Sequence, residues 1–216
     1  MELLKNTYVI NLESRKDRLQ HVINEFNKLN VIPKRFNAIK TGSGAIGCTL
    51  SHIKCLEIAI EKGLENIFIC EDDITFLNSE LFLNNLNKFN KKIKDWDVLI
   101  IGGNVVKPYR EIDNCCLRIV NCQTTTGYIV NKQYYKVLLQ NFREGVKQLI
   151  QNPNLIKKYA IDIYWKFLQI KDKWYMIYPL TVTQYENYSD IEEGITNYNH
   201  LMLDAEKKWL FMQKNV

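Results

Sequence analysis

Three consecutive carboxylates, Glu71-Asp72-Asp73, are the residues of this sequence best suited to chemistry. They directly follow an apolar run, residues 66–70, of the kind that forms a buried β-strand. If the strand continues into the triplet, its period of two places Glu71 and Asp73 on the same side. Carboxylates that close repel each other and raise each other's pKa unless a cation neutralises them. Because hard oxygen ligands suit Mg²⁺ or Mn²⁺, which bridge carboxylates to phosphates, the triplet predicts a site for a metal and a diphosphate.

Two other interpretations of the triplet remain open. It could be a solvated turn in which one aspartate caps the next helix. It could also belong to a phosphatase of the haloacid-dehalogenase type, whose D-x-D-x-T motif follows the first strand. Here Glu71 stands where that motif has its nucleophilic aspartate, and it lies far from the N-terminus. The metal–diphosphate site is favoured because ligands of open α/β sheets bind at the carboxyl ends of strands.

The rest of the sequence alternates between segments typical of strands and of helices. Short apolar runs predict strands at residues 7–12, 33–39, 66–70, 97–101, 117–122, 127–131 and 174–178. Apolar residues at helical spacing predict helices at residues 19–29, 50–60, 80–94, 132–141, 162–169 and 200–212. This order predicts an α/β, Rossmann-like fold with a mostly parallel central sheet flanked by helices. No repeat or linker divides the chain, so we expect a single domain spanning residues 1–216.

Composition excludes several classes of protein. The 216 residues are 46% apolar and 12% aromatic with only nine glycines and four prolines, which excludes disordered and collagen-like chains. The net charge of +5 is dispersed and forms no Arg-rich stripe, so no nucleic-acid partner is expected. Six cysteines form no C-x-x-C pair, which argues against a zinc ribbon. No apolar run approaches the roughly 20 residues of a membrane span, and no signal peptide is visible, so we expect a cytoplasmic protein.

Further segments occur in a characteristic order around the triplet. Upstream lie Tyr8-Val-Ile-Asn-Leu12 with Arg15 and Arg18, Arg35-Phe36-x-Ala38, and Gly47-Cys48-x-Leu50-Ser51-His52. Downstream lie Trp96-Asp97, Gly102-Gly103, Gly127-Tyr128, Ile161-Asp162, Tyr178-Pro179 and Ser189-Asp190. In this order and spacing, most of the chain resembles glycosyltransferase family 25. That family holds the lipooligosaccharide galactosyltransferases and the galactosyltransferase domains of collagen-modifying enzymes.

The resemblance implies a GT-A fold, a UDP-sugar donor, Mn²⁺ or Mg²⁺ as cofactor, and inversion at the anomeric carbon. The chain departs from the family at two positions where many relatives carry a carboxylate, namely Lys40 and Ala45. Both departures lie where such enzymes would hold the nucleoside or the acceptor.

The resemblance also implies roles for individual residues. The metal ligands would be Glu71, Asp73 and Gln184. Contacts to the donor are expected from residues near strand ends and helix starts: Asn11, Arg15, Arg18, Ser51, His52, Asp72, Tyr128 and Asp190. Ser51 and His52 would lie in the first turn of a helix, where anions bind.

The acceptor hydroxyl needs a general base, and Asp162 is the candidate. Its aromatic neighbours could bind sugar and raise its pKa. Structural alternatives stay open for several of these residues. Asp162 could cap a helix, His52 could be a core histidine, and Arg15 could pair with Asp17 at the surface.

The sequence therefore predicts an inverting, metal-dependent hexosyltransferase. It would move galactose or glucose from a UDP-sugar to a glycan or a hydroxylated protein acceptor, as in lipopolysaccharide biosynthesis. The alternative is a non-catalytic module that binds a nucleotide sugar or a glycan on the same fold, which Lys40 and Ala45 would suit. The predicted C-terminal helix could make peripheral contact with a membrane.

Overall fold

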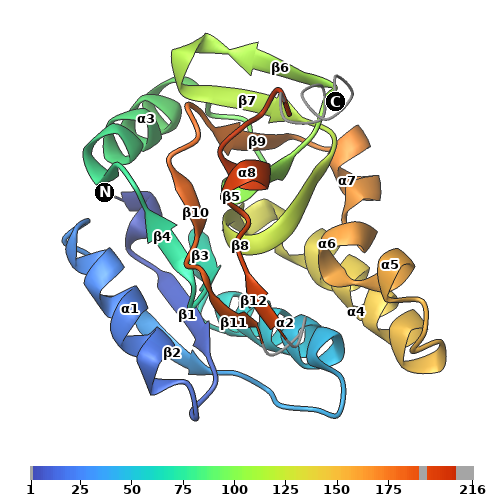
Figure 1. The fold of residues 1–216 in the computed structure, drawn as a ribbon. Helices are drawn as coiled ribbons and strands as arrows, with labels where there is room; N and C mark the ends of the chain where they lie inside the picture. Colours follow the sequence, from blue (N-terminus) through green and yellow to red (C-terminus); the bar gives the residue numbers. More distant parts are fainter. Residues whose placement is uncertain (1, 190–193, 208–216) are drawn as a thin grey trace, which may run out of the picture.

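The computed structural model describes residues 2–189 and 194–207 (Figure 1). Its strands are β1 Thr7–Asn11, β2 Lys34–Asn37, β3 Asn66–Glu71, β4 Ile74–Phe76, β5 Val98–Val105, β6 Tyr109–Ile112, β7 Cys116–Ile119, β8 Cys122–Asn131, β9 Trp174–Ile177, β10 Val182–Gln184, β11 Asn187–Ser189 and β12 Gly194–Thr196. Its α-helices are α1 Lys16–Asn27, α2 Gly44–Glu61, α3 Ser79–Lys92, α4 Tyr135–Gln151, α5 Ile156–Tyr159, α6 Ile161–Tyr164, α7 Lys166–Lys171 and α8 Asn199–Met202. Short 3₁₀ turns cover Glu2–Leu4, Asp113–Cys115 and Lys132–Tyr134.

Most strands of the described chain join one central sheet. Eight strands lie in the order β2-β1-β3-β8-β5-β9-β7-β6. The pairs β1–β2, β1–β3 and β5–β9 are parallel, whereas β8 is antiparallel to both β3 and β5, and β7 is antiparallel to β9 and β6. Six strands thus share one direction while β7 and β8 oppose it. The predicted α/β, Rossmann-like fold with a mostly parallel sheet is confirmed.

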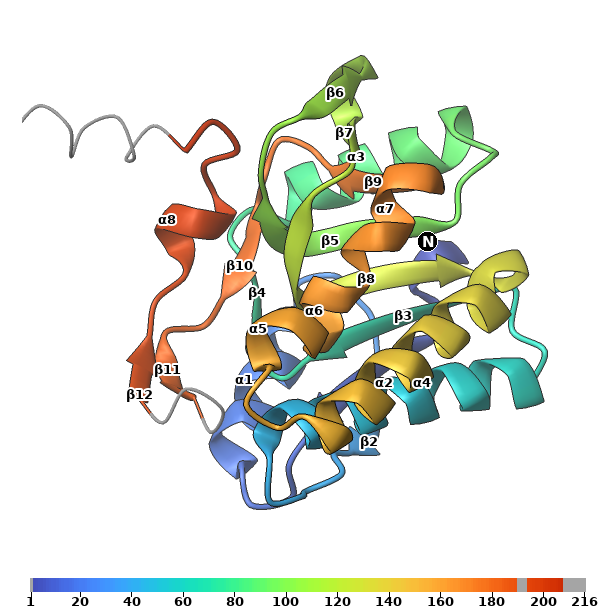
Figure 2. The ribbon, with the colours of Figure 1, turned by 90° about the vertical axis from the view of Figure 1, so that its right-hand side faces the viewer.

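Helices cover both faces of this sheet, which explains why its strands are continuous apolar runs. Alternate residues of β3 point to opposite sides, so that Ile67 and Ile69 enter one core cluster and Phe68 enters the other. The first cluster is completed by α2, α4 and the Trp165 region, and the second by α1 and α3. Figures 1 and 2 show α2, α4 and α5–α7 on one side of the sheet and α1 and α3 on the other.

The sequence prediction was least accurate in the second half of the chain. The helix predicted at residues 162–169 is split into α6 and α7, and the short strands β4 and β10, which pair with each other, were missed. Where a helix was predicted at residues 200–212, the structure has the short helix α8, which ends at Met202. Residues 208–212 lie outside the described residues. In the described ranges, no helix combines the length and the apolar character that crossing a membrane requires.

Candidate functional site

The acidic triplet lies at the carboxyl edge of the sheet, as predicted. Asn11 ends β1 and Glu71 ends the neighbouring β3. The antiparallel strand β8 starts at the same edge, because Gly127 of β8 pairs with Cys70 of β3. Three chain segments therefore bring polar side chains to one place.

The chain turns at the triplet, and this separates the carboxylates. We expected Glu71 and Asp73 on one side if the strand continued, but β3 ends at Glu71, residues 72–73 form a turn, and β4 starts at Ile74. Asp73 faces Arg18 of α1, whereas Glu71 faces Cys48 and His52 of α2. The alternation rule fails here because it applies only to extended backbone.

Arg18 joins the two aspartates. Its Nη1 atom lies 2.9 Å from Oδ1 of Asp72 and 3.3 Å from Oδ2 of Asp73. The three side chains are only 12%, 9% and 11% exposed. Ion pairs this deep are screened little by solvent, so the guanidinium holds both carboxylates in place.

Asp72 and Asp73 differ in whether both of their carboxylate oxygens have hydrogen-bond partners. Asn11 donates to Oδ2 of Asp72 at 2.7 Å and accepts a hydrogen bond from Nε of Arg35 at 2.8 Å, so both oxygens of Asp72 have partners. Oδ1 of Asp73 is buried and has no hydrogen-bond partner among the described residues. Burial, followed by the charge of Glu71, raises the pKa of Asp73 well above its usual range. A cation at Oδ1 would offset both effects, so the residues present fit a divalent metal.

Gln184, the third predicted metal ligand, lies near Asp73 along the backbone. The antiparallel pair β4–β10 places Gln184 opposite Ile74, the residue that follows Asp73. The next residue, Tyr185, donates its backbone N–H to the carbonyl oxygen of Asp73 at 2.6 Å.

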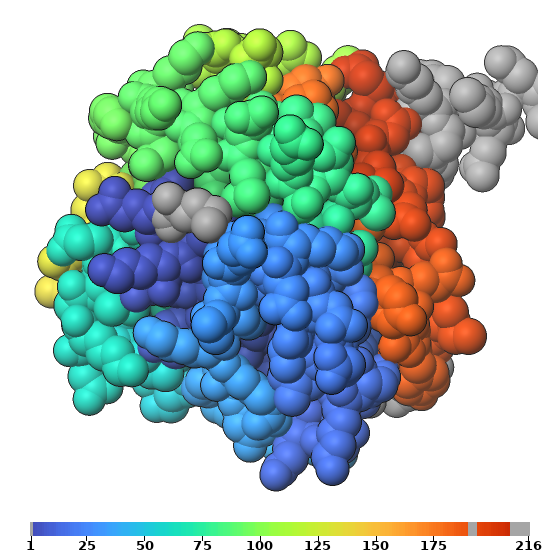
Figure 3. Space-filling view, turned by 90° about the vertical axis from the view of Figure 1, so that its left-hand side faces the viewer, coloured from blue at the N-terminus to red at the C-terminus, as the bar shows by residue number. Residues whose placement is uncertain are grey.

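Arg15 and Arg18 converge on the C-terminal segment. Nη1 of Arg15 and Nη2 of Arg18 each donate to the carbonyl oxygen of Tyr188 at 3.1 Å. Arg15 also forms a two-point ion pair with Asp17, at 3.1 and 3.0 Å, so the surface pairing considered as its alternative is present too. Figure 3 shows the C-terminal segment, in orange and red, along the flank of α1. Asp190, the predicted donor contact beyond Tyr188, lies outside the described residues.

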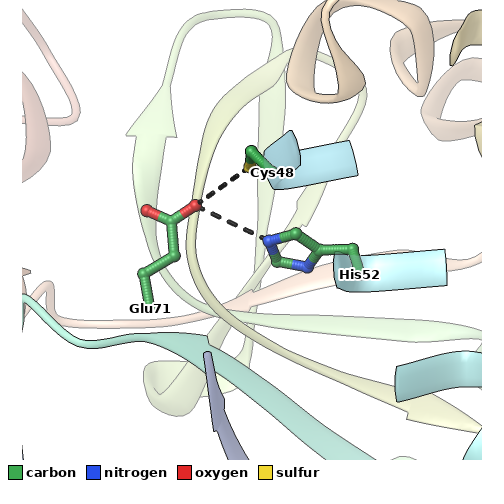
Figure 4. Close-up of side chains that lie close together, drawn as sticks. All are labelled: Cys48, His52 and Glu71. Carbon is green, nitrogen blue, oxygen red and sulfur yellow. Dashed lines mark hydrogen bonds and ion pairs between the residues drawn. The ribbon is translucent and has the colours of Figure 1, made fainter. Parts of the chain in front are cut away.

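Glu71 lies on the other side of the turn, between α2 and β8. Its Oε1 atom accepts a hydrogen bond from Thr125 at 2.6 Å and lies 3.7 Å from Sγ of Cys48 and 3.6 Å from Nε2 of His52 (Figure 4). Burial alone would raise the pKa of Glu71, but His52 and the Thr125 hydroxyl outweigh it and the pKa is lowered. The Glu71 side chain is 22% exposed, so this ionised carboxylate is accessible from outside.

Ser51, His52 and Tyr128, three of the predicted donor contacts, lie in the core. All three are fully buried. Since α2 starts at Gly44, Ser51 and His52 lie about two turns into the helix, and their predicted first-turn placement was wrong. The Ser51 hydroxyl bonds the carbonyl of Gly47 and the N–H of Ile39, while the Tyr128 hydroxyl bonds Nδ1 of His52 at 2.8 Å.

Asp162 lies close to Glu71, because Asp162 bonds Thr124 and Glu71 bonds the next residue, Thr125. It is not a helix cap, because Ala160 holds the N-cap position of α6. Its Oδ2 atom instead accepts the backbone N–H of Thr124 at 3.0 Å, and Thr124 has a φ of 68°, an uncommon conformation for a β-branched residue. Burial raises the pKa of Asp162, and the charge of Glu71 adds to this rise.

Two features of the site were not predicted. No role was predicted for Cys48, but its thiol lies 3.7 Å from Oε1 of Glu71. The spacing of Cys48 and His52, four residues apart on a helix, was the available signal, since such residues share one face. The contact of Tyr188 with the arginines is made by a backbone carbonyl. Every residue has one, so the sequence holds no signal for this contact.

Comparison with known proteins adds relatives for this chain. The family profile described as glycosyltransferase family 25 (LPS biosynthesis protein) matches residues 41–123, which include α2 and the acidic triplet. A Haemophilus influenzae protein assigned by name to the glycosyltransferases is 34% identical over 197 residues, covering 78% of this chain and 66% of that protein.

Two vertebrate relatives match shorter parts of their own length. Procollagen galactosyltransferase 1 of Danio rerio is 25% identical, covering 69% of this chain and 27% of that protein. Inactive glycosyltransferase 25 family member 3 of Homo sapiens is 24% identical, covering 55% of this chain and 19% of that protein. This chain thus spans about two thirds of the bacterial relative and less than a third of these two. Together with the family profile and the bacterial relative, the matches establish that the chain belongs to glycosyltransferase family 25.

Proposed function

We propose that this chain is an inverting, metal-dependent glycosyltransferase of the GT-A type that moves galactose or glucose from a UDP-sugar to a glycan or a hydroxylated protein acceptor. One observation carries the proposal. At the carboxyl edge of the sheet, a buried aspartate, Asp73, lies beside Arg18 and has one oxygen without a hydrogen-bond partner among the described residues. Such a pair of cation and open carboxylate oxygen suits a metal-bound diphosphate.

The donor would be held on the α1 side of the site. Asp73, with Gln184 near it, would hold Mn²⁺ or Mg²⁺, which neutralises charge on the departing diphosphate. Arg15 and Arg18 would bind phosphate oxygens, since guanidinium groups form paired hydrogen bonds with phosphate. Asp72 would act indirectly, through Arg18. Asn11 and Arg18 occupy both of its oxygens, and the contact with Arg18 fixes the position of the guanidinium group.

The acceptor would bind beside Glu71 and Asp162, where side chains of α2, α6 and β8 come together. There Asp162 would take the proton of the attacking hydroxyl. Burial has raised its pKa, which makes it a stronger base than an exposed aspartate. Glu71 is held by Thr125 and would orient the acceptor by accepting a hydrogen bond from a second hydroxyl.

The metal assignment is tested by measuring UDP binding with and without Mn²⁺ by calorimetry. Asp73→Asn should abolish the increase in affinity that Mn²⁺ gives. Asp95→Asn is the matched control, because Asp95 is 70% exposed and its ion pair with Lys173 lies at the surface. If Asp73→Asn and the wild type bind UDP equally well with Mn²⁺, Asp73 is not a metal ligand.

The role of Asp162 needs a different readout. Asp162→Asn keeps the side-chain shape and its oxygen can still accept the Thr124 N–H. UDP affinity should therefore stay at the wild-type value while sugar transfer falls by about 10²-fold or more, as expected when a general base is lost. Undiminished transfer by this variant would assign the base elsewhere.

The alternative is a non-catalytic module that binds a nucleotide sugar or a glycan. It has support from the inactive human relative and from Lys40 and Ala45. A panel of UDP-, GDP- and CMP-sugars, assayed for hydrolysis with Mn²⁺, separates the two functions. Binding of UDP without turnover of any donor would favour the module.

A further inference from the structure

Cys48, His52 and Glu71 form a cluster of three metal-ligand types close to Asp162. Cys48 and His52 lie one turn apart on α2, and Glu71 faces them from the end of β3 (Figure 4). Their ligand atoms, one sulfur, one nitrogen and one oxygen, all lie within 4.8 Å of one another. The Glu71 oxygen, 3.6 Å from Nε2 of His52 and 3.7 Å from Sγ of Cys48, already matches the edges of about 3.3–3.8 Å of a tetrahedron around Zn²⁺, whose bonds are about 2.0–2.3 Å long. The sulfur–nitrogen separation, within 4.8 Å, would shorten by up to about 1 Å on binding.

His52 gives independent evidence for a ligand. It is fully buried, and its Nε2 atom points at Glu71 without a hydrogen-bond partner among the described residues. Its other ring nitrogen, Nδ1, is 2.8 Å from the Tyr128 hydroxyl, and the two rings stack at 5.6 Å. A metal-bound histidine is typically oriented in this way, with the second nitrogen held by a neighbouring polar group.

The ligand set selects a different kind of ion from the one proposed at Asp73. Thiolate and imidazole favour Zn²⁺ and other thiophilic cations, whereas oxygen-only sites favour Mg²⁺ and Mn²⁺. Three protein ligands leave a fourth position for water, on the side where Glu71 is 22% exposed. In the absence of metal, burial and the charges of Glu71 and Asp162 keep the Cys48 thiol protonated, because they raise its pKa.

We propose that Cys48, His52 and Glu71 bind a thiophilic divalent cation, Zn²⁺ in the first place, at a site separate from Asp73. On binding, the Cys48 S–H bond breaks, a sulfur–metal bond forms, and the proton leaves to solvent, while neutral His52 donates its Nε2 electron pair. The bound ion engages the Glu71 carboxylate, which the proposed function assigns to the acceptor, and places positive charge near Asp162. Zn²⁺ would therefore inhibit sugar transfer, but its binding does not depend on the protein having transferase activity.

Cobalt spectroscopy on the tag-free full chain tests the site directly. Co²⁺ bound by a thiolate gives a sulfur-to-metal charge-transfer band, and we expect one equivalent of this band, abolished by Cys48→Ser and displaced by Zn²⁺. Cys116→Ser is the matched control and should keep the band, because Cys116 lies on β7 and a serine there can still bond the carbonyl of Ile112. A wild-type protein without the band, or a band that survives Cys48→Ser, overturns the proposal.

Two further measurements keep the test decisive if Cys48→Ser does not fold. In the wild type, Zn²⁺ should slow alkylation of Cys48 at least tenfold, read by mass spectrometry of the Cys48 peptide, and an unchanged rate overturns the proposal. Asp73→Asn should keep the cobalt band while losing the effect of Mn²⁺ on UDP binding. Loss of the band in Asp73→Asn would mean that the thiophilic ion binds at Asp73 as well, and the proposal of a separate site would be wrong.

Discussion

Arg18→Met is the substitution that most directly tests how the acidic triplet is held. Methionine fills a similar volume but leaves Asp72 and Asp73 buried without their shared cation. The ion pairs that are lost measure 2.9 and 3.3 Å. We expect the protein to fold less stably, because two nearby carboxylates then repel each other in a poorly solvated place.

The size of the effect follows from the burial of the three groups. Removing one partner of a buried ion pair costs about 3–5 kcal/mol. The side chains of Arg18, Asp72 and Asp73 are 12%, 9% and 11% exposed. Because they are not completely buried, the lower end of that range applies. A loss of about 3 kcal/mol in the free energy of unfolding lowers the melting temperature by about 6–12 °C in a chain of this length.

Urea denaturation of a double-mutant cycle measures this directly. Asp73→Asn removes one of the repelling charges, so Arg18→Met combined with Asp73→Asn should lose about 1–2 kcal/mol less than the two single variants summed. Arg143→Met is the control, because its ion pair with Glu57 at 2.7 Å is exposed and should contribute no more than about 1 kcal/mol. Equal losses in Arg18→Met and Arg143→Met, or strict additivity in the cycle, would refute the reasoning.

Two more substitutions test the packing and hydrogen bonding around Glu71. Gly47→Ala should cost about 1–3 kcal/mol of stability in thermal unfolding, because its Cβ would lie 2.4 Å from the carbonyl oxygen of Ile39, whereas Gly42→Ala, with nothing within 4 Å, should change stability by less than about 0.5 kcal/mol. Thr125→Val removes the 2.6 Å hydrogen bond to Glu71 and should cost about 1.5–3 kcal/mol while raising the pKa of Glu71, read by NMR titration of its carboxyl carbon. An unchanged Glu71 pKa in Thr125→Val would show that the hydroxyl does not stabilise the ionised carboxylate.

The first half of the fold could be predicted because its signals are local. Buried runs such as residues 66–70 and the amphipathic pattern of α1 each specify one element, and the alternation of strands and helices specifies the class of sheet. The antiparallel insertion of β8 between β3 and β5 could not be predicted, because pairing partners depend on long-range packing. The β4–β10 pair is only three residues long in each strand, too short for a periodic pattern.

At the site, residue types were predictable and their partners were not. The triplet was placed at the correct edge because it directly follows a predicted strand, and ligands of such sheets bind at the carboxyl ends of strands. The sequence could not say that the chain turns between Glu71 and Asp73, which assigns one carboxylate to α2 and the other to α1. The sequence also could not show that Ser51 and Tyr128 would be fully buried, with no exposed surface.

The C-terminal segment closes the arginine side of the site in a way that bears on donor binding. The Tyr188 carbonyl oxygen accepts hydrogen bonds from both Arg15 and Arg18 at 3.1 Å. A carbonyl oxygen and a phosphate oxygen take the same donor hydrogens, so a diphosphate at these guanidinium groups must displace Tyr188 or share them with it. Tyr185, whose ring stacks on His21 at 4.2 Å, anchors the same segment to α1. The arginines are therefore already oriented for an oxygen ligand, which would lower the entropic cost of binding the proposed diphosphate.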